Sequence, residues 1–427
     1  MNVLLIGSGG REHAIALSTS RSSLLSKLFL IPGNPGTEQL GENVNIDFKD
    51  QPAVTAFCFE KNIEFVIIGP EQPLVDGLSD YLRASGIKVF GPDKAAAEIE
   101  SSKSFAKQLM QKYNIPTASF SEFNKEDYEK AVEYVKSSSL PLVIKADGLA
   151  AGKGVLICNS LNEALTGLEN IFVNSEFGDA GNKIIIEEFM TGEEASIFAV
   201  TDGENFVLLP SAQDHKRIGN NDTGKNTGGM GAYAPAPIIT DELLKVIETA
   251  IIKPTIDALT SEGRAFIGCL YCGLMITETG PKVVEFNCRF GDPETQAVLP
   301  LLDGDILKLF YSAADGHLDE SSVKYSGGTA ICVVAASKGY PDGYEKGFEI
   351  TGLNLDDKNI VIYHAGTKRS GNKIVTNGGR VIGVTATIPE GDLKKAKEKA
   401  YSALSSIKFN GIYFRSDIAD KGINRHS

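Results

Sequence analysis

The sequence predicts a protein of several domains that combines α/β and α+β architecture and begins with a doubly wound parallel sheet. Three strand-then-helix units open the chain, and strands that alternate with helices are typical of a parallel sheet. The 427 residues are enough for about three domains of ordinary size. From about residue 326, short strands accompany the helix “DLKKAKEKAYSALSSI”, which predicts a small α+β domain.

The predicted N-terminal domain, residues 1–100, places a polar or glycine-rich loop after each strand. The apolar stretches “VLLIG”, “KLFLIPG” and “FVIIGPE” precede predicted helices over residues 12–25, 52–62 and 74–85, and “VFGPD” would add a fourth strand. Ligands of doubly wound sheets bind at the carboxyl ends of the strands. The loops “GSGGRE”, “PGNPGT” and “GPEQPL” are therefore expected to form one pocket.

The first of these loops raises the alternative of a nicotinamide dinucleotide site and hence of an oxidoreductase. Gly7 and Gly9 match the first two glycines of the dinucleotide fingerprint. However, Glu12 occupies the third position, where its carboxylate would repel a pyrophosphate. The next strand ends in Pro32, Gly33 and Asn34 instead of an acid for a ribose hydroxyl. Both mismatches argue against the dinucleotide.

The middle domain is expected over residues 101–325, and the C-terminal domain over 326–427. The middle domain begins with the serine-capped helix “SSKSFAKQLMQKY” and continues in a compact α/β stretch over about 115–190.

The segment “LPLVIKADGLAAGKGVLICNS” has the composition of a phosphate-binding loop. Lys145 ends an apolar strand, and Gly152, Lys153 and Gly154 follow in a turn. A mobile glycine loop can close over phosphates, with lysine as a point charge for them. The segment lacks the GKS or GKT and the following helix of a P-loop. A surface hairpin with glycines at positive φ explains it equally well, so both interpretations stay open.

Two pairs of acids follow in “KIIIEEFMTGEEAS”, at residues 187–188 and 193–194. Acids at a strand end commonly face solvent, and this is the default interpretation. They become candidate ligands if one nucleotide binds between them and Lys145, about forty residues earlier.

The most informative segment is “KVVEFNCRFGDPETQ”, residues 282–296. Strand alternation places Glu285, Asn287 and Arg289 on one face and Val284, Phe286 and Cys288 on the other. A carboxylate beside an amide oxygen suits Mg²⁺ that carries nucleotide phosphates, and arginine can bind a carboxylate or phosphate bidentately. A solvated sheet face with an Arg–Glu pair is the alternative, but it does not explain the dense turn “RFGDPE” that follows.

Residues 211–237 form a long polar and glycine-rich stretch in a chain that is otherwise regularly patterned. Long ordered loops of this kind are usually functional, and disorder is the alternative. Asp214, His215, Lys216 and Arg217 would form a solvated run of charges in most proteins. Because a glycine-rich turn follows them, we favour a substrate-binding loop.

Composition excludes several classes of protein. The 42 basic and 55 acidic residues give a net charge of -13, which argues against nucleic-acid binding through a basic surface. The chain shows neither a secretory leader nor about 18 consecutive apolar residues, so no membrane association and a cytoplasmic location are expected. Six scattered cysteines suit a reducing compartment. Cys269 and Cys272 form a CxxC among strand formers, which favours two buried thiols over a zinc or redox site.

Together these motifs resemble the ATP-grasp superfamily, and within it the glycinamide ribonucleotide synthetase (phosphoribosylamine-glycine ligase) family. The resemblance covers essentially the whole chain, with the family's signatures in the family's order. They are “GGREHA”, “PGNPGT”, “GPEQPL”, “KADGLAAGKGV”, “EEFMTGEEAS”, “QDHKR”, “NTGGMGAYAP”, “EFNCRFGDPETQ”, “GYPDGYEKG”, “HAGT” and “RSDIA”.

The resemblance implies a central ATP-grasp fold with a mobile lid subdomain. It implies a carbon–nitrogen ligase of purine biosynthesis, which joins glycine to 5-phospho-D-ribosylamine through a glycyl phosphate and releases ADP and phosphate. Two Mg²⁺ or Mn²⁺ ions would be held by Glu285 and Asn287. Glu194, or in the competing register Glu193, would bind the ATP ribose. The implied ATP-binding residues are Lys103, Lys145, Gly152, Lys153, Gly154, Glu187, Phe189, Met190 and Glu194, with Glu188 facing away.

The resemblance also implies residues for the other two substrates. Arg289 would orient the glycine carboxylate or stabilise the transferred phosphoryl group, Asp214 would bind the glycine ammonium, and Lys145 completes the catalytic set. Glu12 would accept hydrogen bonds from the ribose hydroxyls or the amine. The remaining substrate-binding residues are Gly9, Gly10, Asn34, Gly36, Glu71, Lys216, Gly228 and Gly229. A monomer or a weak homodimer is expected.

Two further functions are compatible with parts of the sequence. A related ATP-grasp carboxylase that activates bicarbonate would share the roles of Lys145 and Glu285, but “HKR” and “NTGGMG” point away from it. A nucleotide sensor without catalysis would lack an intact metal pair, and Glu285 and Asn287 are both present.

Overall fold

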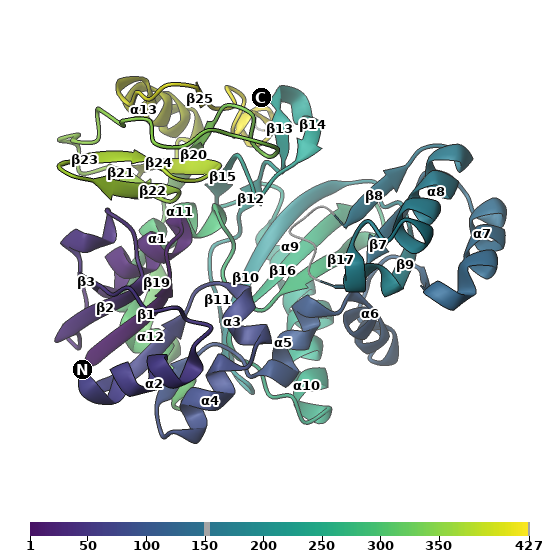
Figure 1. The fold of residues 1–427 in the computed structure, drawn as a ribbon, viewed down its shortest axis with the longest axis horizontal. Helices are drawn as coiled ribbons and strands as arrows, with labels where there is room; N and C mark the ends of the chain where they lie inside the picture. Colours follow the sequence, from purple (N-terminus) through teal and green to yellow (C-terminus); the bar gives the residue numbers. More distant parts are fainter. Residues whose placement is uncertain (149–153, 426–427) are drawn as a thin grey trace.

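A computed structural model describes residues 1–148 and 154–425 of the chain. Figure 1 shows the N-terminal region in purple, a blue lobe at the opposite side, and the C-terminal region in yellow-green above both. The expected multidomain α/β architecture is confirmed.

The N-terminal sheet is parallel, with the strand order β3-β2-β1-β4-β5. The expected helix over 74–85 is divided, because Gly77 adopts a left-handed conformation (φ 87°) that a helix cannot continue through. The elements are β1 (Asn2–Gly7), α1 (Gly10–Thr19), β2 (Lys27–Pro32), β3 (Glu42–Asn43), α2 (Gln51–Glu60), β4 (Ile63–Ile68), α3 (Glu71–Val75), α4 (Leu78–Ala84) and β5 (Lys88–Phe90).

The blue lobe in Figure 1 is an antiparallel sheet of order β6-β9-β7-β8 that two helices cover. It has a hydrophobic core of its own, with Ile144, Leu168 and Ile186 at its centre. A separate core lets this lobe, the expected lid, be treated as a subdomain. Its elements are β6 (Phe120–Asn124), α7 (Tyr128–Ser137), β7 (Leu142–Ala146), β8 (Val155–Cys158), α8 (Leu161–Leu168) and β9 (Lys183–Glu188).

The central sheet has the order β11-β10-β16-β17 and is antiparallel. One face packs on helices through residues such as Ile197, Leu270 and Phe286, in a core that continues into the N-terminal sheet. The opposite face packs in part on α12 through Phe198 and Tyr271, in a second core, and carries polar side chains such as Glu194 and Glu285 beyond it. The elements here are α5 (Lys94–Ser101), α6 (Lys103–Lys112), β10 (Glu193–Asp202), β11 (Phe206–Leu208), α9 (Asp241–Ile247), α10 (Lys253–Ser261), β16 (Ile267–Thr277), β17 (Gly280–Asn287), α11 (Glu294–Val298) and α12 (Ile306–Ala314).

The C-terminal sheet has the order β12-β15-β20-β24-β21, and β25 also pairs with β20. Two of its strands come from the middle region, so this sheet crosses the expected boundary near residue 325. The predicted C-terminal helix is present as α13. The elements are β12 (Gln213–Asp214), β13 (Arg217–Gly219), β14 (Thr223–Asn226), β15 (Gly231–Ala234), β18 (Leu302–Gly304), β19 (Val323–Tyr325), β20 (Thr329–Ser337), β21 (Ile360–His364), β22 (Thr367–Ser370), β23 (Lys373–Thr376), β24 (Arg380–Ile388), α13 (Leu393–Ser406), β25 (Ile412–Tyr413) and α14 (Asp420–Asn424).

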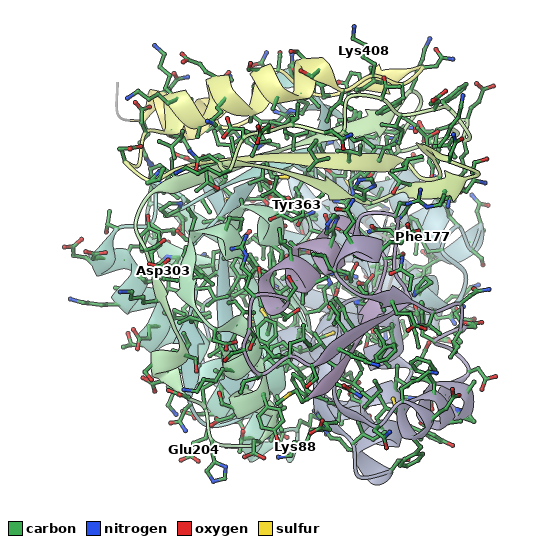
Figure 2. All side chains as sticks on the ribbon, turned by 90° about the vertical axis from the view of Figure 1, so that its left-hand side faces the viewer. Lys88, Phe177, Glu204, Asp303, Tyr363 and Lys408 are labelled. Carbon is green, nitrogen blue, oxygen red and sulfur yellow. The ribbon has the colours of Figure 1, made fainter. Side chains whose placement is uncertain are left out.

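The C-terminal sheet contacts helix α1 at a buried junction near Tyr363, which Figure 2 labels. The ring of His13 meets that of Tyr363 edge-on, with 5.5 Å between centroids. The His13 Nδ1 atom accepts a hydrogen bond of 2.9 Å from the backbone N–H of His364. Burial, aided by His364, lowers the pKa of His13 to about 3. His13 is therefore a neutral acceptor that links two domains.

Candidate active site

Strand β17 presents the expected row of polar side chains to one face of the central sheet. Glu285 is exposed, Asn287 and Arg289 are half-buried, and Phe286 and Cys288 are buried on the other face. The prediction is wrong for Val284, which is half-buried while Val283 is buried. The cause is a register shift: Gly273 faces Glu285 and Leu274 faces Val283, so Val284 bulges out of the ladder.

Three lysines from different motifs surround this strand. Lys216 Nζ lies 3.5 Å from the Glu285 carboxylate and 2.7 Å from that of Glu194. Lys145 Nζ donates to the carbonyl of the bulged Val284 at 3.2 Å. Lys216, and after it Lys145, Arg289 and Lys103, hold the pKa of Glu285 below its usual range against the desolvation that the surrounding side chains cause. Glu285 is thus held as an anion by the cations around it.

Lys145 also belongs to a buried ion-pair network that the sequence did not predict. Its Nζ lies 2.9 Å from one oxygen of Glu187, and Lys107 Nζ lies 3.3 Å from the other. Burial lowers the pKa of Lys107 to about 8. Glu187 thus faces inward, but its carboxylate serves to fix Lys145. Lys107 follows Lys103 by four residues in the predicted helix, and this spacing was the sequence signal that could have identified it.

Lys103 lies at the first turn of α6 and reaches the loop that follows β7. Its Nζ donates to the carbonyl of Gly148 at 3.1 Å, and burial lowers the pKa of its ammonium. The Gly154 carbonyl accepts a hydrogen bond from Ala146 N. The predicted residues Gly152 and Lys153 lie outside the described part of the chain.

The side chains of residues 187–190, at the end of β9, point in different directions. Glu188 is exposed and accepts hydrogen bonds from Ser119 N and Lys282, so it faces away as predicted. Phe189 is 39% exposed and Met190 is half-buried. Both side chains are therefore accessible beside the buried Glu187.

Glu193 and Glu194 point to opposite sides of β10. Glu194 pairs with Lys216, whereas Glu193 pairs with Arg425 at 3.1 Å. Only Glu194 of this pair therefore joins the cluster around Glu285.

The loop over residues 211–237 is ordered throughout its described length. Asp214 lies in β12, and burial raises the pKa of its carboxyl well above the usual range. His215 is 1% exposed, and burial lowers its pKa to about 4. Arg217 begins the β13–β14 hairpin, whose backbone is bound by the buried Arg415. The loop is thus structured, which argues against the alternative of disorder.

Arg289 forms ion pairs with two carboxylates from the N-terminal part of the chain. Its Nε atom lies 3.2 Å from Glu71 and its Nη2 atom 2.9 Å from Glu100. Its Nη1 atom donates to the Phe290 carbonyl. Arg289 and Arg11 lower the pKa of Glu71 against the effect of burial. Arg289 therefore links the end of β17 to Glu71 of α3 and Glu100 of α5.

Glu12 is buried, with 2% of its surface exposed. One carboxylate oxygen accepts from Gly9 N at 2.6 Å and the other from Arg11 Nε at 2.5 Å. Any Cβ at Gly7 or Gly69 would collide with this side chain. The glycines of the first loop therefore make room for Glu12, which explains the failed match to the dinucleotide fingerprint.

Asn34 and Gly36 likewise form internal contacts. The Asn34 amide donates to the carbonyls of Ser8 and His364, both at 2.9 Å, and its oxygen accepts from Gly36 N at 2.8 Å. A Cβ at Gly36 would collide with His13. The second loop is thus fastened to both the first loop and the C-terminal domain.

Gly228 and Gly229 lie where the loop over residues 211–237 meets the C-terminal domain. Arg380 donates to the carbonyls of Gly228 and Asp292, and its Nη2 lies 3.3 Å from the Asp292 carboxylate. Gly229 N donates to Thr227 Oγ1 at 3.0 Å. The buried Gln296 holds Asp292 at 2.8 Å and contacts Gly10. Arg380 and Gln296 were not predicted, because their contacts join segments far apart in the sequence.

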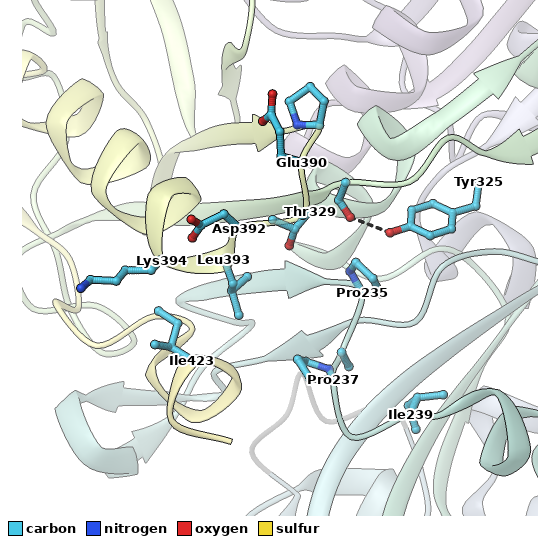
Figure 3. A pocket seen from close by; sticks show the side chains of 14 residues that line it. Pro235, Pro237, Ile239, Tyr325, Thr329, Glu390, Asp392, Leu393, Lys394 and Ile423 are labelled. Atoms are coloured by element: carbon cyan, nitrogen blue, oxygen red, sulfur yellow. Dashed lines mark hydrogen bonds between the residues drawn. The ribbon is translucent and has the colours of Figure 1, made fainter. Parts of the chain in front are cut away.

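A hollow of about 550 Å³ lies elsewhere, between the Pro235–Ile239 segment and the turn before α13. Figure 3 shows prolines and aliphatic side chains at its base with Glu390, Asp392 and Lys394 around it. None of the predicted site residues lines it.

Two features considered from composition above are the cysteines and the apolar segments. All six cysteines are buried and unbridged, and burial raises the pKa of Cys269 and Cys272 well above the usual range. Two inert buried thiols, not a redox pair, occupy the CxxC. Across residues 1–148 and 154–425, no helix is both long and apolar enough to cross a bilayer.

Comparisons with known proteins cover the whole chain. The phosphoribosylglycinamide synthetase family model matches in three parts: the N domain over residues 1–100, the ATP-grasp (A) domain over 101–295 and the C domain over 330–421. The chain is 47% identical to the phosphoribosylamine–glycine ligase of Rhodopirellula baltica (99% of this chain, 98% of the relative) and 48% identical to that of Mesorhizobium japonicum (100% and 99%).

Solved structures agree with this result. The crystal structure of a phosphoribosylamine–glycine ligase from Thermotoga maritima has a TM-score of 0.85 and 35% identity, over 98% of this chain and 100% of that one. The biotin carboxylase domain of Hydrogenobacter thermophilus 2-oxoglutarate carboxylase, solved with MgADP, has a TM-score of 0.74 at 16% identity, over 96% and 91%. The second likeness concerns the fold alone.

Proposed function

The chain belongs to the phosphoribosylglycinamide synthetase family, and from that membership we propose how its residues carry out the ATP-dependent ligation of glycine to 5-phosphoribosylamine. The enzyme is a carbon–nitrogen ligase of purine biosynthesis that yields glycinamide ribonucleotide, ADP and phosphate. The observation that carries the residue assignments is the convergence of two lysines from separate motifs on β17. Lys145 contacts Val284, and Lys216 contacts Glu285.

ATP binds between the lid and the central sheet in this proposal. Lys103 and Lys145 contact its phosphates, and the backbone near Glu187 to Met190 reads the adenine. Glu194 binds the ribose hydroxyls, because it faces the cleft whereas Glu193 pairs with Arg425. Closure of the glycine loop up to Gly154 would exclude water.

Glu285 and Asn287 fit a hard divalent cation, Mg²⁺ or Mn²⁺, because a carboxylate and an amide oxygen lie on one sheet face. The described residues contain no group of three or more His, Cys, Asp and Glu side chains arranged for a metal. Phosphate oxygens and water would therefore complete the ligand set. When bound, the metal neutralises the phosphate charges. Lys216 can release Glu285 to this role and remain paired with Glu194.

The chemistry follows from the poor reactivity of a carboxylate toward amines, since the leaving group would be oxide. A glycine carboxylate oxygen attacks the γ-phosphorus of ATP, and the bond to ADP breaks. The amine of phosphoribosylamine then attacks the acyl carbon of glycyl phosphate, inorganic phosphate leaves with the C–O bonding pair, and the nitrogen loses a proton. Arg289 orients the glycine carboxylate or the transferred phosphoryl group, and Asp214 binds the ammonium.

Phosphoribosylamine binds at the N-terminal loops. Gly9 and Gly10 offer the start of α1 to its polar atoms, Gly36 and Asn34 lie near its phosphate, and Glu71 accepts from its hydroxyls. Because both oxygens of Glu12 are already engaged, we assign it the positioning of Gly9 instead of a direct contact. Lys216, Gly228 and Gly229 complete the wall between the two substrates.

We also propose a cytoplasmic enzyme that is a monomer or a weak homodimer. The net charge of -13 supports freedom from nucleic acid, and the free, buried cysteines suit a reducing compartment. Sedimentation analysis over a range of concentrations would establish the oligomeric state.

The direct test is ADP release with ATP, Mg²⁺, freshly prepared phosphoribosylamine and a panel of amino acids. Glycine with the amine should release ADP in a 1:1 ratio to glycinamide ribonucleotide. ADP release no greater than with ATP alone would overturn the proposal.

A further inference from the structure

Gln213 of β12 is a buried residue that holds the backbone of Glu194. It is 3% exposed, and its Nε2 atom donates a hydrogen bond of 2.7 Å to the Glu194 carbonyl. That carbonyl belongs to the second residue of β10, and the ends of elements are where a structure opens most readily. Gln213 thus secures the strand end that carries a proposed ATP ligand.

The acceptor end of the Gln213 side chain is fixed by Tyr233 of β15. The two residues face each other across the β12–β15 pair, and the Tyr233 hydroxyl donates a hydrogen bond to Gln213 Oε1. Tyr233 is fully buried, and its ring packs near that of His215, with 6.0 Å between centroids. Because a side-chain amide has separate donor and acceptor ends, the bond from Tyr233 directs the Nε2 atom of Gln213 toward Glu194.

The same short segment also contacts the side chain of Glu194. Lys216 follows Gln213 by three residues, and its Nζ atom lies 2.7 Å from the Glu194 carboxylate. The Glu194 side chain is 41% exposed, so a ligand can still reach it. Glu194 is therefore held twice, at its carbonyl by a buried amide and at its carboxylate by a cation.

The position of the Glu194 backbone decides which acid of β10 faces the cleft. Glu193 and Glu194 are neighbours, and successive side chains of a strand point to opposite faces. A shift of the strand end by one residue would therefore direct Glu193 toward the cleft in place of Glu194. The bond from Gln213 opposes this shift, together with the nearby backbone bridge between Ser196 and Ala212.

We infer that Gln213, oriented by Tyr233, is a positioning residue that aims the Glu194 carboxylate at the ribose of ATP and so sets the preference for nucleotides with ribose hydroxyls. The inference rests on the proposed function, in which Glu194 binds the ribose. Gln213 acts through Glu194, since both ends of its own amide are engaged. Loss of Gln213 should weaken recognition of the hydroxyls and spare that of the phosphates, which we assign to Lys103 and Lys145.

The test measures kcat/KM for ATP and for 2′,3′-dideoxy-ATP, which lacks both ribose hydroxyls, at saturating glycine and phosphoribosylamine. It compares the wild-type enzyme with Gln213→Met, because methionine has a similar length but cannot donate to the Glu194 carbonyl. The value for ATP should fall about five- to tenfold, whereas that for the dideoxy analogue should change less than about twofold. A merely structural role of Gln213 would lower both values equally.

Tyr233→Phe is the second variant, and it keeps the Gln213 amide but removes the hydroxyl that orients it. Its preference for ATP over the dideoxy analogue should fall about threefold. Gln111→Met, at an exposed position of α6, is the matched control and should keep the wild-type preference.

A double variant tests whether Gln213 acts through Glu194. Gln213→Met combined with Glu194→Gln should have the same kcat/KM for ATP as Glu194→Gln alone, because both changes remove one and the same interaction with the ribose. Multiplied losses in the double variant would show that Gln213 acts by another route and would overturn the inference.

An unchanged preference for ATP in Gln213→Met, or equal losses for both nucleotides, would also overturn the inference and leave the ligase function intact. Should Gln213→Met fail to fold, an unchanged preference in Tyr233→Phe decides against it. Equal use of both nucleotides by the wild-type enzyme would remove the ribose from Glu194 and overturn the inference with it. A wild-type enzyme without glycine-dependent ADP release would instead overturn the proposed function.

Discussion

Two glutamates, Glu285 of β17 and Glu12 of α1, show how differently the two sides of the cleft are built. Each lies near a basic side chain, but the Glu285 side chain is 43% exposed and 3.5 Å from Lys216, whereas the Glu12 side chain is 2% exposed and 2.5 Å from Arg11. Glu285 can exchange its partner for a ligand, while the oxygens of Glu12 are already satisfied. In our proposal, the central sheet thus presents side chains to the substrates, whereas the N-terminal loops present backbone that side chains hold in place.

Replacement of Glu285 should have the largest effect on activity. Glu285→Ala removes the carboxylate that we assign to the metal, so kcat should fall by about a thousandfold or more, with little change in Tm because the side chain is exposed. Steady-state ADP release and a thermal melt measure both quantities. Glu278→Ala, at the exposed turn of the same hairpin, is the control. Substantial residual activity in Glu285→Ala would move the metal site away from β17.

Replacement of Glu12 should instead act through stability. Glu12→Gln leaves the buried Arg11 without its carboxylate, which should cost about 3 kcal/mol of folding free energy. The matched control is Glu60→Gln, which breaks an exposed pair with the adjacent Lys61 and should cost less than about 1 kcal/mol. Urea unfolding measures both. If stability is unaltered and the KM for phosphoribosylamine rises, Glu12 contacts the substrate directly instead.

Acidic pH should weaken the domain junctions. Burial lowers the pKa of His13 to about 3 and those of His215 and His364 to about 4. Below about pH 6.5 the unfolded chain binds protons that the native protein does not, so stability is full above this pH and declines as the pH falls toward 4. Each histidine contributes up to about 2 kcal/mol of loss at pH 5.

The measurement is Tm between pH 7.5 and 5. His13→Gln should flatten the decline, whereas His317→Gln, at a side chain that is 86% exposed, should leave it unchanged. Equal slopes in wild type and His13→Gln would show that the buried histidine does not set the acid response.

The smallest predicted effect is a difference in the KM for ATP between variants of Glu193 and Glu194 on β10. Glu194→Gln should raise the KM for ATP about tenfold through loss of a charged hydrogen bond to the ribose, whereas Glu193→Gln should change it less than about twofold. The reverse order would assign the ribose to Glu193 and contradict the orientation of Glu194 toward Lys216.

Local pattern predicted the parts of the site that depend on a single strand or loop. Alternation along β17 placed Glu285 and Asn287 on one face, and the sheet topology brought the N-terminal loops to one edge. The bulge at Val284 was not predictable, because it is set by the pairing with β16.

Contacts between distant segments could not be predicted from the sequence either. The two lysines on Glu187 come from α6 and β7, and Arg380 of the C-terminal domain joins Gly228 to Asp292 of the middle domain. Asn34 was expected to bind a phosphate, yet its amide holds His364, 330 residues away. A polar residue in a loop does not reveal whether its partner is a ligand or another part of the chain.

Activation of the glycine carboxylate by ATP on the β17 face is the central step of the proposed reaction. Glycine labelled with ¹⁸O in its carboxyl group tests this directly, in a complete reaction with ATP and phosphoribosylamine. Mass spectrometry of the released inorganic phosphate should find one ¹⁸O atom per molecule of product, transferred from glycine. Unlabelled phosphate, formed at the same rate as glycinamide ribonucleotide, would show that no glycyl phosphate forms and would contradict the account.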